Sequence, residues 1–141
     1  MPNSINLKTN RKEIEIQRDG EVVGYIYFDP TDAAIIDRLL TAKETLDKTP
    51  VPEITDDEDI TVTMKKLREA DGALRAAVDY AFAYPCSDVV FGDGFAITSR
   101  KGVSMFEQFL DGAMDIIEQF MDEEVKASAE RQAKYLDKYR K

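Results

Sequence analysis

The segment from Ser87 to Gly102, SDVVFGDGFAITSRKG, combines glycines with an Arg-Lys pair, which are residue types found in phosphate cradles. A P-loop needs four residues between its first glycine and a Gly-Lys-Ser/Thr ending, and a dinucleotide loop needs Gly-x-Gly-x-x-Gly between a strand and a helix. Neither spacing occurs here, because the apolar run FAI follows the first two glycines. We therefore predict a tight turn, as a small hairpin or an ordered loop, between 89–91 and 95–97, with no bound phosphate.

Four consecutive acidic residues, Asp56, Asp57, Glu58 and Asp59, are the metal-binding candidates of the sequence. They lack the alternating ligands and central glycine of an EF-hand calcium loop. Carboxylates crowded into one turn also do not converge on the octahedral magnesium site that a hydrolase or nuclease would need. The run is instead predicted to begin a helix, where the helix dipole favours acidic side chains. No metal site is expected.

The sequence has no histidine and a single cysteine, Cys86. The missing histidine removes the usual general base at neutral pH, the common nucleophile pairs and the commonest zinc ligand. One cysteine cannot form an internal disulfide and has no metal-ligand spacing. Cys86 is therefore predicted to be a small buried apolar residue in a reducing compartment. We expect a protein that is not an enzyme and uses no cofactor.

The 141-residue chain carries a formal net charge of -9. This acidity disfavours nucleic-acid binding, because affinity for phosphates comes mainly from lysine and arginine. It favours a partner with a basic surface. The N-terminal sequence MPNSINLKTNRK lacks the apolar core of a signal peptide, and no apolar run approaches the roughly 20 residues that span a bilayer. We expect a cytoplasmic protein that does not bind membranes.

Hydrophobic periodicity indicates where the first elements lie. Apolar and charged residues alternate over 13–28 around the turn Asp19-Gly20, which predicts a β hairpin. The motif FDPTD predicts a helix that is capped by Asp29 with Pro30 in its first turn and that ends at the sequence TPVP. An acidic linker is expected to follow this helix.

Two further helices are predicted downstream. The first starts near Ile60, ends at Tyr84-Pro85, and carries Asp71 at a solvent-exposed turn or at a bend. The second covers 105–125, and its apolar residues occupy more than one narrow stripe, so it is expected to be the core helix.

These elements predict an α+β fold that is mainly helical, with the N-terminal β hairpin packed on a bundle of about three main helices. A small β turn or hairpin is expected before the last helix. Residues 1–125 are predicted to form one globular domain, with the hairpin at 1–28 and the helical core at 29–125. Residues 126–141 are predicted to form a helical, partly projecting tail.

Two sets of residues are candidates for protein contacts. Phe91, Phe95 and Phe106 are predicted to be apolar anchors for a partner, and packing between the helices is the alternative for them. A second set in the tail, Tyr135, Leu136 and Tyr139, is predicted to support weak, salt-sensitive homo-oligomers. The acidic run 122–124 before the tail and the basic end 131–141 are expected to pair head to tail between neighbouring copies. The alternative is a frayed, solvated tail on a monomer.

The order of these parts, with FDPTD at 28–32, Val90-Phe91-Gly92 and the helix from Phe106 to Phe120, resembles one known family. It is similar to the small tail assembly chaperones of long-tailed bacteriophages and prophages of Gram-positive bacteria. The resemblance covers most of the chain as an arrangement of elements.

The resemblance implies a nonenzymatic protein of the host bacterial cytoplasm. Such a protein would bind the long, helical tape measure protein and recruit tail tube subunits during tail morphogenesis. The alternative is a small structural or connector protein that is incorporated in a phage particle. Finding the chain in stoichiometric amounts in purified particles would favour that alternative.

Overall fold

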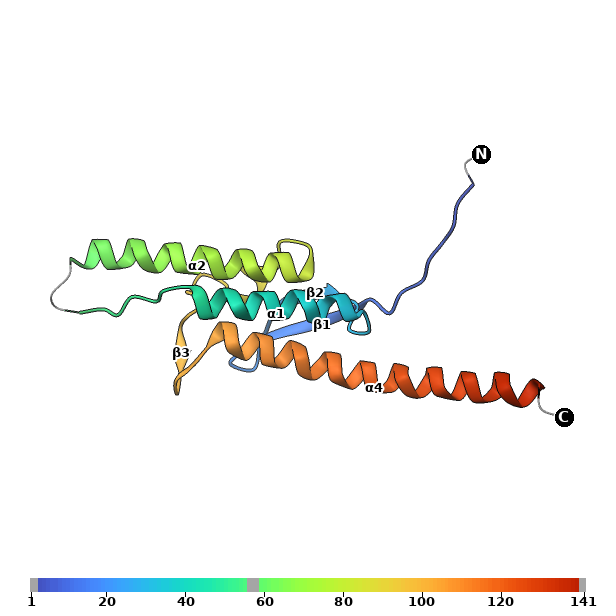
Figure 1. Ribbon diagram of the computed structural model, residues 1–141. Coiled ribbons are helices and arrows are strands. Elements are labelled where there is room, and N and C mark those ends of the chain that lie inside the picture. The colour runs from blue at the N-terminus through green and yellow to red at the C-terminus, as the bar shows by residue number, and fades with distance from the viewer. Residues whose placement is uncertain (1–2, 56–58, 140–141) are drawn as a thin grey trace.

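The computed structural model describes residues 3–55 and 59–139, and its fold is α+β and mainly helical (Figure 1). The strands and helices are, in chain order, β1 (Lys12–Arg18), β2 (Glu21–Phe28), α1 (Ala33–Lys48), α2 (Ile60–Phe82), α3 (Ser87–Phe91), β3 (Ser99–Arg100), β4 (Val103–Ser104) and α4 (Met105–Tyr139). The predicted fold class is confirmed, because an N-terminal hairpin packs on three main helices and a small hairpin precedes the last helix.

The β1–β2 hairpin forms as its alternating sequence predicts. Asp19 and Gly20 both have positive φ angles, of 53° and 82°, as a two-residue turn of this kind requires. The pairing shifts by one residue beyond Ile16, which pairs with Gly24, while Gln17 pairs with Val22. The hairpin therefore contains a β-bulge, which increases the local twist.

Gly24 allows the hairpin to approach α3 closely. A Cβ atom at this position would lie 2.7 Å from Cγ1 of Val89, closer than two carbon atoms can pack. The φ angle of Gly24 is 158°. A side chain here would push β2 away from α3.

The first helix begins later than the sequence analysis predicts, and Asp29 is not its cap. Helix α1 starts at Ala33, and the side chain of Asp32 caps it by accepting a hydrogen bond from Ala34 N. Asp29 instead accepts hydrogen bonds from the N–H and the hydroxyl of Thr31 and from Asn10 N. Burial opposes its charge, but these bonds outweigh burial and lower the pKa of Asp29.

Helices α1 and α2 lie side by side and run in opposite directions (Figure 1). Helix α2 starts at Ile60 and ends at Phe82, close to its predicted bounds. Asp59 caps it by accepting a hydrogen bond from Thr61 N. The other three acidic residues of the run that was predicted to begin this helix, Asp56, Asp57 and Glu58, lie outside the described residues.

Of the two forms predicted for the segment after α2, a small hairpin or an ordered loop, the structure has the ordered loop. Residues 89–91 belong to the short helix α3, because the carbonyl of Cys86 accepts hydrogen bonds from the N–H groups of Val89 and Val90. The small hairpin lies further on, as β3 and β4 around the positive φ angles of Lys101 and Gly102. The segment between Phe91 and Ser99 is an ordered loop.

Helix α4 is continuous from Met105 to Tyr139, so the predicted core helix and tail are one helix. Ser104 Oγ caps it by accepting a hydrogen bond from Glu107 N. Its first half is part of the core, where Phe106 and Ile117 are at most 1% exposed. Residues 122–134 are all exposed, and this half extends beyond the rest of the fold (Figure 1).

Raising the pH is expected to destabilise the fold through Cys86. Burial, with a smaller contribution from the charge of Asp79, raises the pKa of this thiol to about 12. The usual value for a cysteine is about 8.5. Between these two values the unfolded chain loses the proton and the folded chain keeps it. The free energy of unfolding therefore falls by up to about 1.4 kcal/mol per pH unit.

Urea titrations between about pH 8 and 11 measure how the free energy of unfolding changes with pH. The change is large enough to detect, because about 1.4 kcal/mol is a tenfold change in the unfolding equilibrium. The matched control is Cys86→Ala, because the other alkaline groups titrate in both proteins. The variant should lose less stability per pH unit than the native chain. Equal slopes in the two proteins would contradict the expectation.

Candidate functional site

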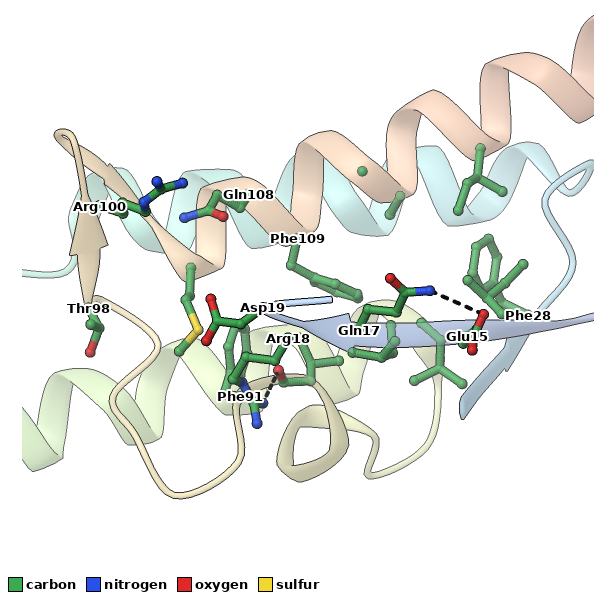
Figure 2. Close-up of a pocket in the computed structure, with 18 of the residues that line it drawn as sticks. Glu15, Gln17, Arg18, Asp19, Phe28, Phe91, Thr98, Arg100, Gln108 and Phe109 are labelled. Atoms are coloured by element: carbon green, nitrogen blue, oxygen red, sulfur yellow. Dashed lines mark hydrogen bonds between the residues drawn. The ribbon is translucent and has the colours of Figure 1, made fainter. Parts of the chain in front are cut away.

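A groove lies between β1 and the first half of α4, with a volume of about 580 Å³ (Figure 2). Residues of five elements, of the β1–β2 turn and of the loop before β3 line it: Ile14, Glu15, Ile16, Gln17, Arg18, Asp19, Ile26, Phe28, Val90, Phe91, Thr98, Ser99, Arg100, Met105, Gln108, Phe109, Gly112, Ala113 and Ile116. The groove forms only when the chain folds, because its lining comes from two distant segments, 14–28 and 90–116.

Strand β1 borders the groove with residues of both of its faces, and Ile26 and Phe28 of β2 line the groove as well. Consecutive residues from Ile14 to Asp19 line the groove, although successive side chains of a strand point to opposite faces. Within the described residues, β1 pairs with β2 alone, and no backbone–backbone hydrogen bond joins it to another segment. The outward N–H and C=O groups of alternate β1 residues are thus open to another strand.

The floor of the groove is apolar and aromatic. Phe28, Phe91 and Phe109 line it, and Figure 2 shows Phe109 extending from α4 toward β1. These rings belong to a continuous series of contacts, with centroid distances of 5.1 Å for Phe28–Phe82, 5.4 Å for Phe82–Phe109, 6.1 Å for Phe91–Phe109 and 6.3 Å for Phe91–Phe106. The series joins the hairpin, α2, α3 and α4 under the groove.

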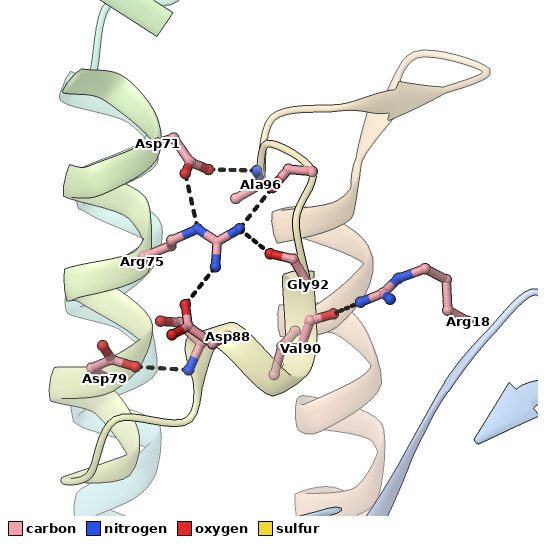
Figure 3. Close-up of polar contacts among 10 residues, drawn as sticks. Arg18, Asp71, Arg75, Asp79, Asp88, Val90, Gly92 and Ala96 are labelled. Atoms are coloured by element: carbon pink, nitrogen blue, oxygen red, sulfur yellow. Dashed lines mark hydrogen bonds and ion pairs between the residues drawn. The ribbon is translucent and has the colours of Figure 1, made fainter. Parts of the chain in front are cut away.

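The rim of the groove carries charges of both signs, with Glu15 and Asp19 opposite in sign to Arg18 and Arg100. Arg18 also has a structural contact, because its Nη2 donates a 2.8 Å hydrogen bond to the carbonyl of Val90 (Figure 3). An apolar floor, a polar rim and an open strand edge together suit a polypeptide segment. Such a segment can bury side chains and pair its backbone at the same time.

Arg75 of α2 holds the loop that supports this floor (Figure 3). Its Nη2 donates 2.7 Å hydrogen bonds to the carbonyls of both Gly92 and Gly94, and its Nε donates at 2.9 Å to Asp71. Its Nη1 donates at 2.8 Å to Asp88. The Asp88 side chain is 92% exposed, so this last ion pair contributes little to stability.

Two acidic residues of α2 complete the attachment of the loop. Asp71 accepts a 2.7 Å hydrogen bond from Ala96 N, and Asp79 accepts a 2.8 Å bond from Ser87 N (Figure 3). The expectation that Asp71 lies at a solvent-exposed turn or a bend is wrong. Its side chain is 14% exposed, and it faces the loop from an uninterrupted helix.

The three predicted partner anchors lie in different environments. Phe91 and Phe106 are 1% and 0% exposed, so their side chains are part of the core and do not reach a partner in this conformation. Phe95 is half-buried. Packing therefore describes Phe91 of α3 and Phe106 of α4, whose rings contact each other in the core.

The predicted self-association residues lie near the end of α4. Leu136 is 55% exposed, as is expected of an apolar side chain open to a contact. The backbones of Tyr135 and Tyr139 are helical, but their side chains lie outside the described part of the structure. The self-association of this segment stays a prediction.

Neither the groove nor the role of Arg75 was predicted from the sequence. The spacing of Asp71 and Arg75, four residues apart in a helix, was a visible signal for an ion pair. No sequence pattern linked Arg75 to the carbonyls of Gly92 and Gly94. Among the described residues, no group of three histidine, cysteine or acidic residues is placed to bind a metal ion. None of the described helices is both long enough and apolar enough to span a bilayer.

Replacing Arg75 is expected to release the loop from α2. Arg75→Gln would leave the carbonyls of Gly92 and Gly94 without their donor, which should cost about 1–3 kcal/mol of stability. Hydrogen exchange should quicken at 87–98 more than elsewhere in the chain. Arg68→Gln on the exposed surface of α2 is the matched control. Equal urea midpoints and equal exchange in the two variants would refute the role of Arg75.

Removing the end of α4 tests the predicted self-association. A chain that ends at Val125 should self-associate more weakly at low salt and high protein concentration than the 141-residue chain, whose additional association through the tail should be lost in salt. Sedimentation velocity measures both. The prediction fails if both chains are monomeric under these conditions.

Comparison with known proteins assigns the chain to no family. No family model, no curated protein and no solved structure matches it.

Proposed function

We propose that this protein is a phage tail assembly chaperone, a nonenzymatic protein of the host bacterial cytoplasm. It would bind the tape measure protein and recruit tail tube subunits during tail morphogenesis. The observation that carries the proposal is the groove between β1 and α4, which offers apolar side chains and backbone groups to a polypeptide. The resemblance in the order of the elements supports the same function.

The groove suits the temporary binding of a client segment. Its volume of about 580 Å³ accommodates several apolar side chains but not a long helix. A client would therefore be held at short apolar segments, and the aromatic floor would contact them. Weak contacts of this kind allow release when the tail is complete.

The charge and the exposed half of α4 fit the same role. A net charge of -9 favours a basic client surface and disfavours nucleic acid. The exposed residues 122–134 leave a helical surface on which tail tube subunits or further copies can pack. Both features also suit a structural or connector protein of the particle, so the decisive difference is whether the chain leaves the finished tail.

Filling the groove should abolish client binding without harming the fold. Gly112 lines the groove in α4, and a Cβ atom there would meet nothing within 4 Å. Gly112→Phe would place a ring in the groove, and the loss of a helical glycine should offset any cost in stability. Gly72→Phe is the matched control, because Gly72 is equally unobstructed but lies in α2 away from the groove.

Each variant is co-expressed with the tape measure protein of the same phage, and capture is measured by affinity purification. The native chain and Gly72→Phe should capture the tape measure protein, and Gly112→Phe should not. Capture by all three proteins would exclude the groove as the binding site. If the native chain captures no tape measure protein but is stoichiometric in purified particles, the structural alternative replaces the proposal.

A further inference from the structure

The segment before β1 is an exposed arm with a strand-like sequence. Residues 3–11 form no helix or strand, and Ile5 and Leu7 are 89% and 83% exposed. Their spacing of two places both side chains on one face of an extended chain. Two such exposed apolar residues on one face indicate a surface that another protein segment covers.

The arm carries positive charge on an acidic protein. It contains Lys8 and Arg11, and residues 3–11 include no acidic residue. The exposed face of β1 is acidic by contrast, because Glu13 and Glu15 alternate with the inward-facing isoleucines. An extended arm beside β1 would thus place opposite charges next to each other.

The arm cannot reach the groove of its own chain. Asn10 ties its base to the turn between β2 and α1, with a 3.2 Å hydrogen bond from its N–H to Asp29 and a 2.9 Å bond from its side chain to Thr31. To pair with its own β1, the arm would have to reverse direction at this tethered position. Instead it extends away from the fold (Figure 1).

We propose that the arm of a second copy of this chain, residues 3–9, adds as a third strand to the free edge of β1. Ile5 and Leu7 enter the groove and contact its aromatic floor. Lys8 lies on the opposite face of the added strand, next to Glu13 or Glu15 of β1. The arm and β1 have matching lengths of seven residues, since β1 covers Lys12–Arg18.

This inference goes beyond the proposed function, because the occupant of the groove is part of the chain itself. The arm and a client segment would then compete for one groove. Copies would associate through their arms when no client is present.

The first test uses the complete purified protein and sedimentation velocity. Ile5→Asp combined with Leu7→Asp should weaken self-association at least about tenfold, because it removes both apolar anchors. Val51→Asp combined with Ile54→Asp is the matched control, since these residues are also exposed, at 48% and 66%, and the added charge is the same. The control should self-associate like the native chain.

The second test identifies the binding site with a labelled peptide of residues 3–11. The peptide should bind the native chain and the Gly72→Phe variant, and should bind Gly112→Phe at least about tenfold more weakly. Circular dichroism verifies that each variant is folded. The same peptide with both apolar residues replaced by aspartate should not bind.

Three results would overturn the inference. They are equal effects of the two double substitutions, equal peptide binding by the two glycine variants, and self-association that depends on residues beyond Val125 alone. No tape measure protein is used, so these failures are distinct from a failure of the proposed function.

Discussion

The arrangement around the groove depends on the hydrogen bonds that the guanidinium of Arg75 donates to the loop after α3. The guanidinium joins α2 to the carbonyls of Gly92 and Gly94, while its neighbour Asp71 binds the N–H of Ala96. The carbonyl of Ala96 in turn accepts a hydrogen bond from Phe106 N at the start of α4. A continuous path of hydrogen bonds thus runs from the middle of α2 to the first turn of α4. It sets where α4 begins relative to the rest of the core.

This attachment explains how an isolated hairpin can be stable in the fold. A two-stranded sheet is marginal in water unless one of its faces is packed. The loop and α3 place Phe91 and Val90 beneath the hairpin. Arg18 of the hairpin donates a hydrogen bond to the carbonyl of Val90. The hairpin is held at α3 by β2 and by Arg18 at the end of β1, and the free edge of β1 has no strand partner among the described residues. The groove is a consequence of this one-sided support.

The chain therefore combines a closely packed aromatic floor with open edges. The floor consists of aromatic rings that are packed in series, and the open parts are the β1 edge, the arm and the second half of α4. Each open part is a polypeptide surface that can pair or pack with another chain. A protein that gathers subunits and a long client needs several such surfaces on one small domain, and their number fits the proposed chaperone role.

The sequence by itself determined the elements that rest on local patterns. Alternation and Asp19-Gly20 determined the hairpin, helical spacing determined α2 and the core part of α4, and the composition of the tail determined its helical continuation. Each of these signals lies within a few residues of the structure it specifies. Even here, the cap of α1 is Asp32 and not Asp29, because Thr31 and Asn10 occupy the carboxylate of Asp29.

Only the tertiary structure decided the site. The helical state of 89–91, the inward position of Phe91 and Phe106, and the groove all depend on Arg75 and Asp71 reaching residues about 20 positions away in the chain. Such contacts leave no periodic pattern in the sequence. Every residue has a backbone carbonyl, so a side chain that binds one does not restrict which residue supplies it. The groove likewise depends on the spacing between β1 and α4, which packing sets and no single segment encodes.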